Sequence, residues 1–91
     1  MIAVLKYELI PGNREIHIPK DAKILNVAFQ GDTLLMWAKV NSDMGMEIRN
    51  FYAFETGIEI PKDSASNFQY LGTGFKNQGL GSHVFEKKTN Y

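Results

Sequence analysis

Arg49 is the side chain in this sequence best suited to bind an anion. It lies inside a run of strand-forming residues, next to Ile48 and two residues before Phe51. Arg14, the other arginine, adjoins the Gly12-Asn13 turn. A guanidinium can hold a phosphate through two hydrogen bonds or stack on a planar base. If Arg49 faces a ligand, it needs no internal partner, and its replacement with alanine would cost affinity and little stability. The alternative is an arginine that lies along a sheet surface with its charged head in water.

A glycine-rich segment, residues 70–81, is the second feature suited to a ligand. Its glycines allow the backbone to approach a bound molecule, so N–H groups around Gly72 and the Thr73 hydroxyl could bind phosphate oxygens. The spacing is not G-x-G-x-x-G and no helical pattern follows, which excludes dinucleotide-binding and P-loop motifs. Thr56, which precedes Gly57, offers another hydroxyl and an exposed N–H. The alternative for the segment is a mobile hairpin loop.

Rings that could stack on a base are the third feature. Trp37 and Tyr7 are the aromatic residues best placed for this, because every nucleobase presents a π-face. The alternative for both rings is ordinary core packing. His83 directly follows the glycine-rich segment, and its imidazole could stack at the rim of a pocket or play a structural role. These features predict a ligand site made of Tyr7, Trp37, Arg49, Thr56, Gly72, Thr73 and His83.

Catalytic and metal-binding arrangements are not supported by the spacing of reactive residues. His17 and His83 are far apart and neither stands in a metal-ligand motif, and the chain has no cysteine. The aspartates fall mostly in turns, where a solvated carboxylate is the usual case, and no serine stands in a nucleophile motif. We therefore expect a protein that is not an enzyme and that carries no cofactor and no metal.

The charge balance limits the partners. Ten Lys and Arg against ten Asp and Glu give a formal net charge of zero. Binding to DNA, RNA or an anionic membrane requires a clear excess of basic side chains, so none of these partners is expected. No uncharged run approaches the ~20 apolar residues of a membrane span. Lys6 and Glu8 interrupt the first apolar run, which does not read as a signal peptide. A cytoplasmic protein is the resulting expectation.

The elements that must position these residues are predicted to be β-strands. Turn signals recur every 8–15 residues, and β-branched and aromatic residues fill the runs between them. We predict one all-β domain over residues 1–91, an antiparallel sandwich or barrel of about 6–7 short strands with no helix longer than two turns. The expected strands are residues 3–10, 14–18, 24–30, 33–41, 46–55, 67–73 and 82–87.

Two of these strands are apolar on both faces. Leu35 and Trp37 alternate with an apolar row on the other face of their strand, and Phe51 lies opposite Tyr52 and Phe54. A chain of 91 residues has little left to cover a third layer. The second apolar face, which carries Leu35, Trp37 and Phe51, therefore predicts a subunit interface or a ligand pocket. The alternative is the ordinary central strand of a sandwich.

Six short motifs together resemble a small, mostly uncharacterised family of phage-encoded domains of about this length. They are Ile18-Pro19 with Ala22 to Leu25, Leu35-x-Trp37-Ala38-x-Val40, Arg49 with Phe51, Thr56-Gly57, Tyr70 to Thr73, and His83 to Glu86. The family is similar to viral sponge proteins that sequester cyclic dinucleotide immune signals, such as the cyclic GMP–AMP of bacterial CBASS defence. The resemblance implies a homo-oligomer, tetrameric or dimeric, that holds such a signal in the cytoplasm of the infected host cell without cleaving it. The alternative function is a small phage accessory protein that binds and inhibits a host protein.

Overall fold

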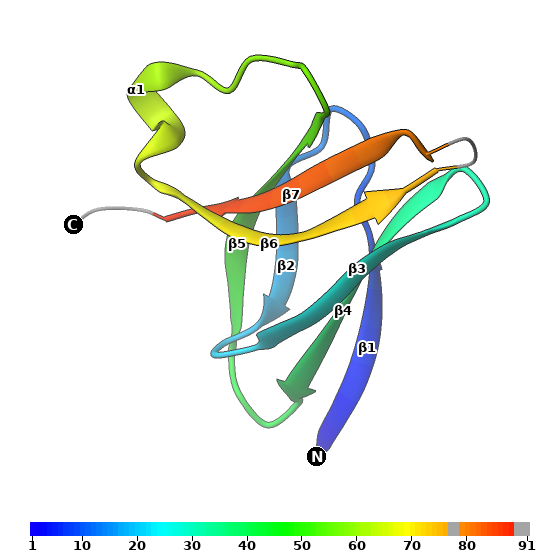
Figure 1. Cartoon of the computed structure of the whole chain (residues 1–91). Helices are drawn as coiled ribbons and strands as arrows, with labels where there is room; N and C mark the ends of the chain where they lie inside the picture. The colour runs from blue at the N-terminus through cyan, green and yellow to red at the C-terminus, as the bar shows by residue number, and fades with distance from the viewer. Residues whose placement is uncertain (77–78, 89–91) are drawn as a thin grey trace.

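The described part of the chain folds into seven strands and one short helix. The computed structural model describes residues 1–76 and 79–88, and Figure 1 shows the arrangement of their elements. The elements are β1 (Ile2–Glu8), β2 (Glu15–Pro19), β3 (Lys23–Gln30), β4 (Thr33–Asn41), β5 (Met46–Glu55), α1 (Lys62–Ala65), β6 (Phe68–Phe75) and β7 (Gly81–Lys87). The prediction of an all-β antiparallel domain is confirmed. Residues 70–75 of the glycine-rich segment belong to β6 and are not a loop, and residues 77–78 of the segment lie outside the described part of the chain.

The strands form two antiparallel sheets that pack face to face. The first sheet has the order β1-β4-β3, and the second has the order β2-β5-β7-β6. Short turns join β3 to β4 and β4 to β5. Gly31, in the turn between β3 and β4, has a φ of 61°, which a residue with a side chain adopts only at a cost. The glycine that marks this hairpin in the sequence is therefore favoured by the backbone conformation of the turn.

Alternating apolar residues of the two sheets meet in the core. Val27, Leu34, Met36, Phe51 and Val84 form one buried cluster, and Ile18, Ala22, Ala38 and Val40 form the other. Tyr7 is half-buried and packs against both clusters, and burial raises the pKa of its phenol. Tyr7 is thus a core residue. Core packing was the alternative to the role of stacking on a base. Phe51 is 3% exposed. The expectation that Phe51 belongs to a second, outward apolar face is wrong, because the register of β5 turns it toward the other sheet.

Trp37 lies on the outer side of the first sheet. Its neighbours in register are Lys6 on β1 and Asn26 on β3, and its ring is half-buried. Leu35 faces the same way but is only 5% exposed. Within one chain the outer face of β4 is therefore already covered at Leu35 and remains half-exposed only at Trp37. In β5 the outward residues are Ile48, Tyr52 and Phe54.

The glycines of β6 allow the two sheets to approach closely. A Cβ placed on Gly72 would lie 2.8 Å from Cγ2 of Val27 on β3, and one on Gly74 would lie 3.1 Å from Cδ1 of Leu34. Both glycines therefore face the interior, where a side chain would collide with the first sheet. Their positions are explained by packing between β6 and β3, and a phosphate-binding role has no support from this placement.

The long connection between β5 and β6 crosses from one end of the second sheet to the other. Glu55 ends β5 opposite Ser82, whereas Phe68 begins β6 opposite Lys87, so the connection spans the length of β7. It contains α1 and forms the arch at the upper left of Figure 1. Within the described residues, no helix is long and apolar enough to cross a membrane.

Candidate functional site

The outer side of the second sheet carries five aromatic rings in mutual contact. We call them the aromatic face; its members are Tyr52, Phe54, Phe68, Tyr70 and Phe85. Their ring centroids lie 5.1 to 6.4 Å from those of their neighbours, within the range of favourable aromatic pairs. The alternation of β5, β6 and β7 directs all five rings away from the core. Four are half-buried, and Tyr70 is 56% exposed. A planar ligand can therefore reach a surface of π-faces that is already in place.

A continuous chain of hydrogen bonds runs beside these rings, from the residue that follows β5 across β7 to β6. We call it the hydroxyl–histidine chain; it consists of Thr56, His83, Thr73 and Tyr70. Thr56 Oγ1 lies 2.8 Å from Nε2 of His83, and the other ring nitrogen, Nδ1, lies 2.9 Å from Thr73 Oγ1. Thr73 Oγ1 lies 2.6 Å from the Tyr70 hydroxyl. The chain is held by the β6–β7 ladder, in which Thr73 and His83 are direct register partners.

The hydroxyl–histidine chain can change the direction of its hydrogen bonds. A neutral imidazole has one donor and one acceptor nitrogen, so one threonine donates to the ring and the other accepts from it. Hydroxyl groups can rotate, and the direction of donation along the chain can therefore adjust to a ligand. Thr56 and Tyr70, at the two ends, are both exposed. The chain can present a donor or an acceptor to a sugar hydroxyl, a phosphate or a base.

Two cations flank the aromatic face. The guanidinium carbon of Arg14 lies 4.7 Å from the centroid of the Tyr52 ring, a cation–π distance. Lys87 is exposed and stands in register with Phe68, an aromatic-face residue. Positive groups at its margins, with hydroxyls across it, make the face suitable for a planar ligand that carries few negative charges.

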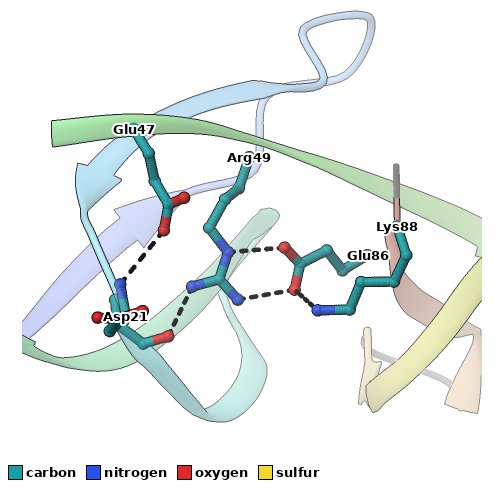
Figure 2. Close-up of polar contacts among 6 residues, drawn as sticks. Asp21, Glu47, Arg49, Glu86 and Lys88 are labelled. Atoms are coloured by element: carbon teal, nitrogen blue, oxygen red, sulfur yellow. Dashed lines mark hydrogen bonds and ion pairs between the residues drawn. The ribbon is translucent and has the colours of Figure 1, made fainter. Parts of the chain in front are cut away.

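Arg49 has a different environment from the one its sequence context suggested. Its Nε and Nη2 donate to the two carboxylate oxygens of Glu86 at 2.6 and 2.7 Å, and its Nη1 donates to the carbonyl of Ala22 at 2.6 Å (Figure 2). The Arg49 side chain is 15% exposed and that of Glu86 is 6% exposed. The expectation that Arg49 lacks an internal partner is wrong. Both residues occupy inward positions of neighbouring strands, where a lone charge would be costly, so each is the obligatory partner of the other.

The charged surroundings of this ion pair set the protonation of Glu86. Burial alone raises the pKa of the carboxyl, but the hydrogen bonds and positive charge of Arg49, joined by Lys88 at 3.4 Å, outweigh it. The pKa of Glu86 therefore lies below its ordinary value of 4.5. The hydrogen bond to Glu86 raises the pKa of Arg49 in spite of burial. Both groups are charged at neutral pH.

Acid should weaken the fold through this pair. Because the folded state lowers the pKa of Glu86 below 4.5, the pair contributes its full stability above that pH and loses it as the pH falls through the lowered value. Thermal unfolding between pH 6 and 2.5 should show the drop in Tm below about pH 4.5. Glu86→Gln keeps an acceptor for Arg49 but does not titrate, so it should have a shallower dependence. An equal drop in this variant would assign the acid sensitivity to other carboxyls.

The seven residues predicted for the ligand site fall into two groups. Thr56, Thr73 and His83 come together in the hydroxyl–histidine chain. The other four lie elsewhere: Tyr7 in the core, Trp37 on the outer side of the first sheet, Arg49 in an ion pair between the sheets, and Gly72 against Val27. The structure thus separates the arginine from the hydroxyls that were expected to share a phosphate with it.

Sequence reasoning missed Tyr70 and the aromatic face. The sequence did carry a signal for this face. In β5 and β7, Tyr52, Phe54 and Phe85 alternate with buried residues and therefore face away from the core. Tyr70 and Thr73 are three residues apart, and simple alternation places them on opposite faces. The register shift between Tyr70 and Gly72 restores them to the same face. This bulge is not visible in the sequence.

The fold and the site define a small β-sandwich with an aromatic, hydroxyl-bearing sheet face suited to a planar polar ligand. Within the described residues, no group of three or more potential metal ligands comes together. Residues 1–91 match the family model described as a domain of unknown function, DUF7352, and the chain belongs to that family. No curated protein and no solved structure matches the chain.

Proposed function

We propose that this protein binds and sequesters a cyclic dinucleotide or related nucleotide signal without cleaving it, at the aromatic face and the hydroxyl–histidine chain. The observation that carries the proposal is their adjacency. Exposed rings can stack on bases, and Thr56, Thr73 and His83 can bond sugar or phosphate groups. The resemblance to viral sponge proteins supports the same function, and the proposal therefore includes an activity in the cytoplasm of an infected host cell.

The strength of such a site is compatible with signal capture. Stacking contributes about 1–3 kcal/mol per base. Hydrogen bonds to charged groups contribute about 1.5–3 kcal/mol each. Two stacked bases and two or three such bonds approach the roughly 12 kcal/mol of nanomolar affinity. Arg14 and Lys87 supply the positive charge that two phosphates require, without the basic excess of a nucleic-acid binder.

The proposal includes self-association into a dimer or tetramer. Met46 and Ile48, on β5, are 58% and 51% exposed, which leaves apolar surface available to a second copy. A ligand with two equivalent halves suits a two-fold axis, where each subunit offers the same residues. Light scattering at micromolar concentration should therefore give at least a dimer mass. A mass of 10.3 kDa, that of one chain, would contradict this part of the proposal.

A thermal-shift screen with matched histidine variants tests the binding proposal. The panel contains cyclic dinucleotides, cyclic ADP-ribose isomers and ordinary nucleotides. A ligand at a thousandfold excess over Kd stabilises the native state by about 4 kcal/mol. In a domain of this size that corresponds to a rise in Tm of more than ten degrees, at about 4–8 °C per kcal/mol. His83→Ala should remove most of the shift, whereas His17→Ala, on the edge strand β2, should retain it.

The outcome of this screen also decides between the two candidate functions. Stabilisation by none of the nucleotides would overturn nucleotide capture and would favour the accessory protein that inhibits a host protein. Stabilisation retained in His83→Ala would overturn the placement of the site, although not the function.

A further inference from the structure

A concave site lies at one end of the sandwich. It is a cleft of about 380 Å³ between the connection that joins β1 to β2, the turn that joins β3 to β4, and the last residues of β5. This volume lies within the usual range for small-molecule sites, roughly 300–1,000 Å³. Its apolar lining comes from Leu9, Phe29, Leu34 and Phe51. The cleft is thus floored by the edge of the hydrophobic core.

The edge of β5 continues past the end of β2 at this cleft, where the described residues supply no strand partner for it. The ladder between β2 and β5 ends where the N–H of Phe51 donates to the carbonyl of Arg14 at 2.8 Å. Backbone groups alternate in direction along a strand, so those of Ala53 point to the same edge as those of Phe51, beyond the end of β2. Ala53 is exposed although its side chain points between the sheets, because the cleft opens there. One residue offers a donor and an acceptor side by side.

A second polar group also lines the cleft. Ser82 lies in its wall and is 8% exposed as a residue. Its hydroxyl can donate a hydrogen bond to a bound molecule or accept one from it. The free edge is too short for a peptide strand, but one N–H and one C=O match the hydrogen-bonding edge of a nucleobase. Ser82 and the strand edge therefore favour a small polar ring over a chain.

The charges of the cleft select against an anion. Glu8, Asp32 and Glu55 line it against Arg14 and Lys76, so the acidic groups are in excess by one. The ammonium of Lys76 is already placed over the Phe29 ring, 5.6 Å from its centroid. Carboxylates accept hydrogen bonds from sugar hydroxyls and repel phosphates.

From this combination we propose that the cleft binds an uncharged nucleoside. The base pairs with the backbone edge of Ala53 and lies on the apolar floor, while carboxylates of the rim accept the ribose hydroxyls. The cleft adjoins the aromatic face, since Arg14, Tyr52 and Phe54 also line it. It differs from that face in the three carboxylates of its rim, which oppose a phosphate.

Amide chemical shifts of the ¹⁵N-labelled protein, titrated with adenosine, guanosine, cytidine or uridine, test this proposal. At least one nucleoside should give saturable shifts at Phe51, Ala53 and Ser82, and the monophosphate of that nucleoside should bind about tenfold more weakly or worse. Ala53→Trp fills the cleft from an exposed position and should abolish the shifts. Ala65→Trp, an equally exposed alanine in α1, should preserve them.

Three results would overturn the proposal. The first is the absence of shifts at the cleft with all four nucleosides at millimolar concentration. The second is an undiminished response in Ala53→Trp, provided that its Tm shows a folded protein. The third is a monophosphate that binds the cleft more tightly than its nucleoside. None of these results decides nucleotide capture at the aromatic face, which is tested separately by the thermal shift of the His83→Ala variant.

Discussion

Replacing Arg49 with alanine is expected to lower the free energy of unfolding by about 3–5 kcal/mol, because removal of one partner from a buried ion pair leaves the other charge without compensation. Glu86, at 6% exposure, would keep only Lys88, whose ammonium lies 3.4 Å from one of its oxygens. The carbonyl of Ala22 would also lose its donor. Urea denaturation of the parent and the variant measures the difference directly.

Two further variants make this result specific. Arg14→Ala removes the exposed arginine and should cost no more than about 1 kcal/mol. Replacing both partners, as Arg49→Met with Glu86→Leu, should recover most of the lost stability, since the cost comes from an unpaired charge and not from lost volume. If Arg49→Ala lowers the free energy of unfolding as little as Arg14→Ala does, Arg49 has no structural role. The ligand-binding role predicted from the sequence would then be favoured.

Replacing Gly72 with alanine should destabilise the protein by about 1–3 kcal/mol through overpacking between the sheets. The new Cβ would lie 2.8 Å from Cγ2 of Val27, a methyl on a stiff, β-branched side chain that is 3% exposed. The neighbour cannot rotate away without disturbing the core. The midpoint of urea denaturation reports the change.

Gly45→Ala is the matched control for this prediction. Its added Cβ would meet only Cε of Lys20 at 3.9 Å, an ordinary contact, so its effect should stay within about 0.5 kcal/mol. In the double variant Gly72→Ala with Val27→Ala, the clashing methyl is gone, and the combined cost should be smaller than the sum of the single costs. Additive costs would mean that β6 and β3 do not approach as closely as described.

The fold was predictable because its determinants are local. Turn residues such as Gly31, together with β-branched and aromatic runs, specify where strands begin and end, and the seven strands of the described residues lie where strands were expected. The partner of each strand is a non-local property. Arg49 illustrates the difference, because its partner Glu86 is 37 residues away and is recognised only when both strands are seen to face inward.

The candidate site was predictable in part for the same reason. Thr56, Thr73 and His83 were identified from their residue types near glycines, and ladder pairing brings them together. Gly72 was expected to let a phosphate approach the backbone, whereas the group that approaches it is Val27. The position of Tyr70 could be predicted only with knowledge of the β-bulge in β6. The aromatic face could be recognised only by knowing which residues of three strands point outward.

Isothermal titration of the protein with cyclic GMP–AMP, or with the cyclic nucleotide that gives the largest thermal shift, tests nucleotide capture most directly. The parent should bind with nanomolar to micromolar Kd, and the ligand should be recovered unchanged afterwards. Thr73→Val, which keeps the shape and removes the central hydroxyl of the hydroxyl–histidine chain, should weaken binding about tenfold or more. Thr33→Val, outside the aromatic face, should bind like the parent. No heat of binding with any cyclic nucleotide, or equal affinity of Thr73→Val and the parent, would contradict capture at this site.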